Sequence, residues 1–227
     1  ETLDETFQPG PFVKTIGSKM YALADANMHF SGIRLPDQWN TDAVGAGFTN
    51  MSTEASGSEQ LTAVAKYQQN VAVFAESTVQ IWFVDPNPDL NRQVQVLANT
   101  GTASPRSVTQ FGDNDVFYLD SGVRSLRARD SSNTASTSDI GIAVDTLVTA
   151  KLDTMSADER ARIIGLIEPR DKRFWLIMKD VIFVFSFFSS GARSVSAWTT
   201  YLPGFDIDEA IVFGRHVYLR SGDTIYV

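Results

Sequence analysis

The sequence predicts an all-β fold, a β-propeller-like repeat of antiparallel meanders, from three observations. One pattern, an apolar burst followed by a short polar break and a second strand-like stretch, occurs five times in 227 residues. The bursts are rich in Val, Ile, Phe, Tyr and Trp, which pack well on a pleated surface. They also recur with a period in the forties to fifties, as propeller blades do, because each blade is one four-stranded meander.

The five bursts are expected to be pairs of antiparallel strands joined by tight turns. Their sequences are KMYALADANMHF, VAVFAESTVQIW, VFYLDSGVRSLR, FWLIMKDVIFVF and VYLRSGDTIYV, from Lys19, Val71, Val116, Phe174 and Val217. With Met20 as the first equivalent position and the other four starts unchanged, successive starts are 51, 45, 58 and 43 residues apart.

The polar breaks have the residues that hairpin turns need. Ser121-Gly122 and Ser221-Gly222-Asp223 are expected to turn tightly, with Gly supplying a positive φ at no steric cost. Several bursts are apolar on consecutive residues, which predicts strands covered on both faces. A β-sandwich is the alternative, because a sandwich also needs many short strands separated by turns and the period here is uneven.

One short helix is expected near residues 156–164. Ser156-Ala157-Asp158-Glu159 matches a capping box with acidic residues in the first turn, and Gly165 follows the helix. Residues 99–107 and 130–141 lack apolar periodicity and are expected to be loops.

Composition predicts one domain over residues 1–227, as a piece of a longer polypeptide. The chain is 43% hydrophobic, enough for a substantial core, and it has no cysteine for disulfides or thiolate chemistry. The most apolar stretch, Phe174 to Phe188, has Lys179 and Asp180 at its centre and is too short for a bilayer span of about 20 residues. A net charge of −8 argues against a protein that grips nucleic acid through many phosphates.

The motifs of catalysis are missing from the sequence, so no enzyme activity, cofactor or metal is expected. His29 and His216 have no neighbouring ligand or catalytic partner in a known spacing. Three acidic clusters could offer oxygen ligands to a cation, but each lacks the rest of a calcium loop, and turn capping explains them better. They are Asp113-Asn114-Asp115, Asp85-x-Asn87-x-Asp89 and Asp206-x-Asp208-Glu209.

Arg124, Arg127 and Arg129 form the one concentrated basic patch. If they lie on a strand, Arg127 and Arg129 share a face and could contact phosphate or an acidic neighbouring subunit. The alternative, which we favour, is a solvated edge strand protected by its charges.

The order of these segments resembles the tail nozzle proteins of short-tailed bacteriophages, also called tubular tail or packaged-DNA stabilisation proteins. The likeness covers most of residues 15–227, and no single motif is diagnostic. It is carried by GIRLPDQWN from Gly32, VAVFAESTVQIWFVDP from Val71, SPRSV from Ser104 leading into FGDNDVFYLDSGVRSL, and RFWLIMKDVIFVFSFF from Arg173 followed by Ser196-Ala197-Trp198 and Tyr201-Leu202-Pro203-Gly204.

The resemblance implies a structural virion protein, assembled in the host cytoplasm, that is not an enzyme and has no small-molecule substrate. Such a subunit forms a ring, expected to be a hexamer, below the portal and adaptor proteins. Its channel retains and then conducts the genomic DNA without sequence-specific binding, and tail fibres or spikes attach around it. A carbohydrate-binding or glycoside-cleaving β-propeller remains the alternative.

Overall fold

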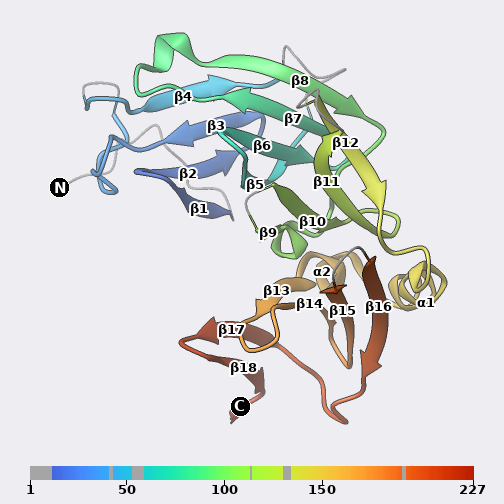
Figure 1. Cartoon of the computed structure of the whole chain (residues 1–227). Coiled ribbons are helices and arrows are strands. Elements are labelled where there is room, and N and C mark those ends of the chain that lie inside the picture. The colour runs from blue at the N-terminus through green and yellow to red at the C-terminus, as the bar shows by residue number, and fades with distance from the viewer. Residues whose placement is uncertain (1–11, 41–42, 53–58, 113, 130–133, 191–192) are drawn as a thin grey trace. The chain divides into compact units, whose positions relative to one another are not determined.

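The computed structural model describes residues 12–40, 43–52, 59–112, 114–129, 134–190 and 193–227. Its strands form five separate sheets, each made of strands consecutive in the sequence (Figure 1). The first sheet contains β1 (Val13–Ile16), β2 (Lys19–Ala24), β3 (Asn27–Phe30) and β4 (Gly47–Asn50). The second contains β5 (Leu61–Tyr67), β6 (Asn70–Ala75), β7 (Thr78–Phe83) and β8 (Arg92–Ala98).

The third and fourth sheets also have four strands, and the fifth has three. The third contains β9 (Thr109–Phe111), β10 (Asp115–Leu119), β11 (Val123–Arg129) and β12 (Thr134–Asp139). The fourth contains β13 (Ile164–Glu168), β14 (Arg173–Met178), β15 (Val181–Ser190) and β16 (Arg193–Tyr201), and the fifth β17 (Glu209–Phe213), β18 (His216–Ser221) and β19 (Thr224–Tyr226). The short helices are η1 (Pro88–Leu90), η2 (Pro105–Ser107), α1 (Asp145–Leu152) and α2 (Ala157–Ala161).

The predicted repeat is confirmed. The five bursts form β2, β6, β10, β14 and β18, which are the second strands of the five sheets, and each is followed by its hairpin partner. Five separate meanders make the fold an all-β propeller of five blades and exclude the two-sheet sandwich.

The two predicted turn glycines have different roles. Gly222 has a φ of +55°, as expected. Gly122 is absent from the positive-φ residues, so that prediction was wrong. Its lack of a side chain matters for space, because a Cβ there would lie 2.3 Å from the Asp145 carboxylate.

Two local predictions need correction. Residues 134–139, within the predicted loop 130–141, form β12. The predicted helix ends at Ala161 and not near Ile164, because Ile164 and Gly165 already belong to β13. Its start is confirmed, since the capping box of Ser156 and Glu159 is present. The helix α1 was missed because, of its eight residues, only Val148 is buried, which leaves no apolar stripe in the sequence.

The chain divides into two compact units. Unit 1 comprises Glu1–Ala103, Gly112–Val116 and Leu126–Thr137, and unit 2 comprises Ser104–Phe111, Phe117–Ser125 and Ser138–Val227. In unit 1, Leu23 and Phe30 of the first sheet pack with Val73 of the second in one buried cluster. No helix in the described residues is long and apolar enough to cross a membrane.

Within unit 2, the fourth sheet is buried on both faces, as the consecutive apolar residues predict. Phe183 and Phe185 share one cluster with Phe117 of the third sheet, while Ile182 and Val184 share another with residues of the fifth. Neighbouring residues along β15 therefore pack against different sheets, which explains why the strand does not alternate between apolar and polar.

Candidate functional site

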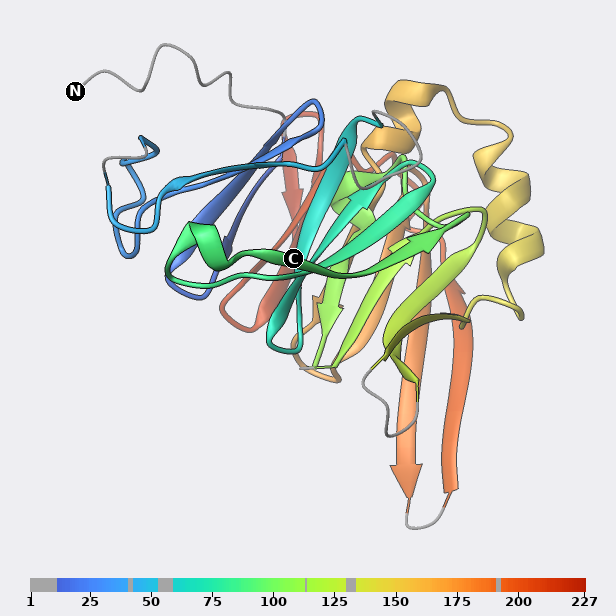
Figure 2. The same ribbon diagram turned by 90° about the horizontal axis from the view of Figure 1, so that it is seen from above.

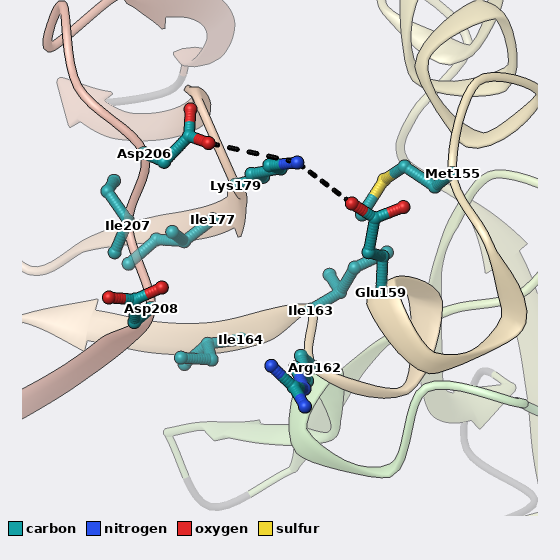
Figure 3. A pocket seen from close by; sticks show the side chains of 10 residues that line it. All are labelled: Met155, Glu159, Arg162, Ile163, Ile164, Ile177, Lys179, Asp206, Ile207 and Asp208. Atoms are coloured by element: carbon teal, nitrogen blue, oxygen red, sulfur yellow. Dashed lines mark hydrogen bonds and ion pairs between the residues drawn. The ribbon is translucent and has the colours of Figure 1, made fainter. Parts of the chain in front are cut away.

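A cavity of about 300 Å³ lies in unit 2 where three segments meet (Figure 3). The segment around α2, the strands β13 and β14 with the turn that follows β14, and the loop that leads into β17 each supply part of its wall. The lining residues are Met155, Glu159, Arg162, Ile163, Ile164, Ile177, Lys179, Asp206, Ile207 and Asp208. Five of them are apolar and five are charged.

The apolar part of the lining belongs to the core. Ile163 and Ile177 are each 1% exposed, and Ile164 and Ile207 are nearly as buried. Ile164, Ile177 and Ile207 share the cluster that joins the fourth and fifth sheets. The cavity therefore has a firm aliphatic floor, because these side chains are fixed by packing on their other sides.

Lys179 is the centre of the charged part. It lies in the tight turn between β14 and β15 with a φ of +52°, and its carbonyl accepts a 2.6 Å hydrogen bond from the Ile207 amide. Its Nζ is 2.9 Å from Glu159 Oε1 and 3.7 Å from Asp206 Oδ2. This lysine therefore connects α2, the turn and the loop before β17.

The Lys179 and Glu159 charges are held in their ionised forms. The hydrogen bond from Lys179 and the two from Ser156 lower the pKa of Glu159 to about 2. The hydrogen bond to Glu159 in turn raises the pKa of Lys179. Both shifts favour the charged forms, so the two groups form an ion pair near neutral pH.

The remaining charged groups lie on separate walls of the cavity (Figure 3). Asp206 and Asp208 come from the loop before β17, and Asp208 Oδ2 accepts a 2.7 Å hydrogen bond from the Gly222 amide. Arg162 follows α2, and within the described residues its guanidinium has no hydrogen bond or ion pair. The bidentate pair of Arg106 and Glu209 lies in the same unit. The hydrogen bond from Arg106 lowers the pKa of Glu209, and the charges of Arg106, Arg220 and Arg162 lower it further, in that order.

The basic patch predicted at Arg124, Arg127 and Arg129 is divided by the structure. Arg124 is bound to the chain itself, with Nη1 at 2.9 Å from Asp139 and 2.8 Å from Asp145. Arg127 lies 3.4 Å from Asp115, and the Arg129 side chain is outside the described residues. The edge-strand interpretation was wrong, because β11 is covered by β12 on one side and β10 on the other.

Asp115 is the partly buried carboxyl group next to this patch. Burial raises its pKa, and the charge of Arg127 opposes that effect. Burial and the charge of Asp115 both raise the pKa of Tyr67, whose hydroxyl has no hydrogen-bond partner in the described structure. This pair belongs to unit 1 and lies outside the cavity.

Of the predicted acidic clusters, Asp85-x-Asn87-x-Asp89 caps a turn, as expected, whereas Asp206, Asp208 and Glu209 bind Lys179, the Gly222 amide and Arg106. The Asn87 amide donates to Asp85 Oδ1 at 2.9 Å, and the Asp89 amide donates to Asn87 Oδ1 at 3.2 Å. In the cluster Asp113-Asn114-Asp115, Asp113 is outside the described residues and Asp115 pairs with Arg127. The described part of the chain holds no group of three or more metal-ligating side chains.

Sequence reasoning identified the parts of the cavity without identifying the cavity. The capping box pointed to Glu159, and Asp206 and Asp208 were noted as an acidic cluster. Arg162 carried no signal, because an arginine at the end of a short helix is common on solvated surfaces. Only the meeting of segments far apart in the sequence brings these charges together.

Comparison with known proteins gives a fold and no family. No protein-family model matches the sequence, and no curated protein matches it significantly. Among solved structures, a candidate 6-phosphogluconolactonase from Bacteroides uniformis matches 95% of this chain and 70% of its own, with a TM-score of 0.54 and 10% identity. This likeness shows the propeller fold alone.

Two further structures match with TM-scores that are too low to carry an argument. The AfRom2 CNH domain has a TM-score of 0.43 at 11% identity, over 99% of this chain and 71% of its own. The hemopexin fold protein CP4 from cow pea has a TM-score of 0.31 at 11% identity, and the match covers 82% of this chain and 88% of the cow pea chain.

Proposed function

We propose that this chain is a structural subunit of the tail nozzle of a short-tailed bacteriophage. In this role it forms a ring with copies of itself, joins the portal and adaptor above and fibres or spikes around it, and lines a channel for the genome. It acts in the virion by contact and has no catalytic step.

The sequence resemblance supports this role because three of its segments fall at equivalent places in the fold. Those three segments form the hairpins β6–β7, β10–β11 and β14–β15, and Ser196-Ala197-Trp198 belongs to β16, whereas GIRLPDQWN lies between β3 and β4. A likeness spread over one repeated unit is what a shared propeller architecture requires.

The observation that carries the proposal furthest is the hairpin β15–β16. β14 pairs with β15 from Val181 to Phe185, whereas β16 continues to pair as far as Ser190. The outer half of the hairpin therefore has no third strand among the described residues, and it extends beyond the rest of its sheet (Figure 2). Two-stranded ribbons are marginally stable in water, so this extension is suited to packing against another chain.

The free edge of β16 also lacks the protection that soluble proteins give to such edges. Ser194 to Tyr201 contains no charged residue and no proline. Of the residues on the hairpin, Phe187 is 53% exposed and Val195 is 59% exposed. A long uncharged edge strand is a template for pairing with another chain, and in the nozzle a neighbouring subunit covers it.

The alternative of a carbohydrate-binding or glycoside-cleaving propeller has less support. The ten residues that line the cavity include no aromatic side chain for a sugar ring to stack on. Its Glu159 is held ionised by Lys179, whereas a glycosidase needs a carboxylic acid that stays protonated to protonate the leaving group.

Negative-stain electron microscopy of the purified full-length protein tests the proposal. Closed rings with a central hole are expected. Monodisperse monomers that bind glycans on an array would overturn the nozzle assignment in favour of the carbohydrate-binding alternative.

A variant tests whether the edge of β16 forms the contact between subunits. Ala197→Lys places a charge on the free edge of β16 and is expected to reduce the fraction of ring particles. Ala103→Lys, at an exposed position outside any strand, is the matched control and should leave rings intact. Rings that are equally abundant in both variants would show that β16 does not form the subunit contact.

A further inference from the structure

We infer that the cavity between α2, β13 and the loop before β17 binds a small zwitterion, a molecule with a carboxylate and an ammonium group joined by an aliphatic chain. The assembly role proposed above does not use this cavity. The inference therefore stands on the geometry of the cavity alone.

The size and floor of the cavity suit a small aliphatic ligand. Its volume of about 300 Å³ lies at the lower end of the range for small-molecule sites. Ile164, Ile177 and Ile207 supply buried aliphatic surface, and no aromatic ring is among the lining residues. Methylene groups can cover this floor, whereas a sugar would find no ring to stack on.

The cation of Arg162 supplies one end of the site. Its guanidinium has no hydrogen bond or ion pair within the part of the chain that the structure describes, and the exposed Arg162 is one of the residues that line the cavity (Figure 3). Lys179 is the other cation of the lining, but Glu159 and Asp206 already hold it. Arg162 is therefore the cation available for a ligand, and its planar fork matches a carboxylate.

The carboxylates of Asp206 and Asp208 supply the opposite end. Asp208 Oδ2 accepts a 2.7 Å hydrogen bond from the Gly222 amide and lies 3.9 Å from Arg220 Nη1, which leaves Oδ1 as an acceptor. Asp206 Oδ2 lies 3.7 Å from Lys179 Nζ, which is beyond hydrogen-bond distance. Its carboxylate can therefore accept a hydrogen bond from a ligand.

The charges of the lining favour a ligand that carries both signs. Three acids and two bases line the cavity, and a simple anion is repelled by Asp206 and Asp208, whereas Glu159 is already paired with Lys179. A simple cation would leave Arg162 unpaired. A zwitterion with an aliphatic spacer can pair with Arg162 at one end and with Asp206 and Asp208 at the other. Its methylene groups then cover the isoleucine side chains between them.

The experiment is a titration of the full chain, with isoleucine methyl groups labelled for NMR. The probe is 6-aminohexanoate, and hexanoate and hexylamine are its matched analogues, each lacking one charge. We expect saturable shifts of the Ile164, Ile177 and Ile207 methyl signals with 6-aminohexanoate, and at least about tenfold weaker binding of both analogues, because each loses a charge-assisted hydrogen bond.

Variants assign the two ends of the ligand. Arg162→Ala should weaken binding of 6-aminohexanoate at least about tenfold and leave the affinity for hexylamine unchanged. Asp208→Asn retains an acceptor for the Gly222 amide. It should weaken the binding of 6-aminohexanoate and leave the affinity for hexanoate unchanged. Arg215→Ala, an exposed arginine outside the cavity, is the control and should bind as the unaltered protein does.

Several results would overturn the inference. No saturable shift at millimolar probe, equal binding of hexanoate and 6-aminohexanoate, or an unchanged affinity in Arg162→Ala would each do so. Thermal unfolding of every variant checks that a loss of binding is not a loss of folding. Ring formation is measured separately, so failure of this site leaves the nozzle assignment unaffected.

Discussion

Arg124 is a cation that the structure holds inside the chain and does not offer to a ligand. Its side chain is 20% exposed, and it bonds Asp139 and Asp145, while Asp145 Oδ1 also accepts a 3.0 Å hydrogen bond from the Val123 amide. Gly122 makes this possible, because any Cβ there would collide with the Asp145 carboxylate. The arginine therefore ties β11 to the segment that begins α1.

Arg124→Ala is expected to lower the free energy of unfolding by about 1–3 kcal/mol, because it leaves two partly buried carboxylates without their shared donor. Urea unfolding followed by tryptophan fluorescence measures this. Arg215→Ala should change the midpoint little. A loss no larger than that control would show that the ion pairs are solvent-screened and contribute nothing.

Glu159 gives the stability a defined pH dependence. Its pKa falls from 4.5 to about 2 in the folded chain, because of hydrogen bonds from Lys179 and Ser156. A carboxylate with a lowered folded pKa stabilises the protein above its unfolded pKa and loses that effect as pH falls through the folded value. The stabilisation is thus present above about pH 4.5 and disappears towards about pH 2.

Glu159→Gln should therefore melt at a lower temperature than the unaltered protein at pH 7, and the difference should close as pH falls from 5 to 2. Differential scanning calorimetry across this range, with Asp158→Asn as the control from the same helical turn, measures it. A difference that is independent of pH would indicate that Glu159 acts only through the shape of its side chain.

Among the elements, strands that bury both faces could be predicted, and elements held by side-chain contacts could not. The segments that form β6 and β15 are apolar because neighbouring sheets cover them. Their burial can therefore be predicted from their residues alone. β12 reads TASTSD and has no such pattern. It is fixed partly by Gln95 of β8, whose side chain bonds the Ala135 amide and carbonyl at 2.9 and 2.8 Å.

The same reasoning separates the predictable from the unpredictable parts of the cavity. The Ser156–Glu159 capping box is a local signal, because both partners lie within four residues. The pairing of Glu159 with Lys179 spans 20 residues and depends on the turn after β14. No local pattern encodes such a pair, so the charged wall could be found only in the folded chain.

The close approach of β13 to η2 gives a prediction for Gly165. A Cβ at this position would lie 2.3 Å from the Ser107 carbonyl oxygen of η2, and a backbone oxygen cannot swing aside as a flexible side chain can. Gly165→Ala is expected to cost about 1–3 kcal/mol in the free energy of unfolding through overpacking. Chemical denaturation measures it, and Ser196→Ala on an exposed strand is the control. An unchanged midpoint would contradict the close packing of β13 on η2.

At the scale of the whole molecule, the fold is a series of local units. Each sheet is made of strands consecutive in the sequence, so its pairings close short loops. Repetition of one hairpin is therefore visible as a period in the sequence, whereas a face that would bind other chains leaves no such period. The proposed nozzle role depends on such faces and on the net charge.

The net charge of −8 gives the last prediction, that the protein does not bind duplex DNA. Non-specific binding is driven by cations that displace counterions from phosphates, and an acidic surface cannot supply them. Fluorescence anisotropy of a labelled duplex at low salt should therefore stay flat as protein is added. The control changes four exposed acids, Asp89, Asp153, Asp158 and Asp223, to Lys, which raises the net charge by 8 to zero and should introduce weak, salt-sensitive binding. If the unaltered protein binds the duplex, and salt weakens that binding steeply, a concentrated basic surface exists despite the net charge, and a channel wall that lets DNA slide without sticking is excluded.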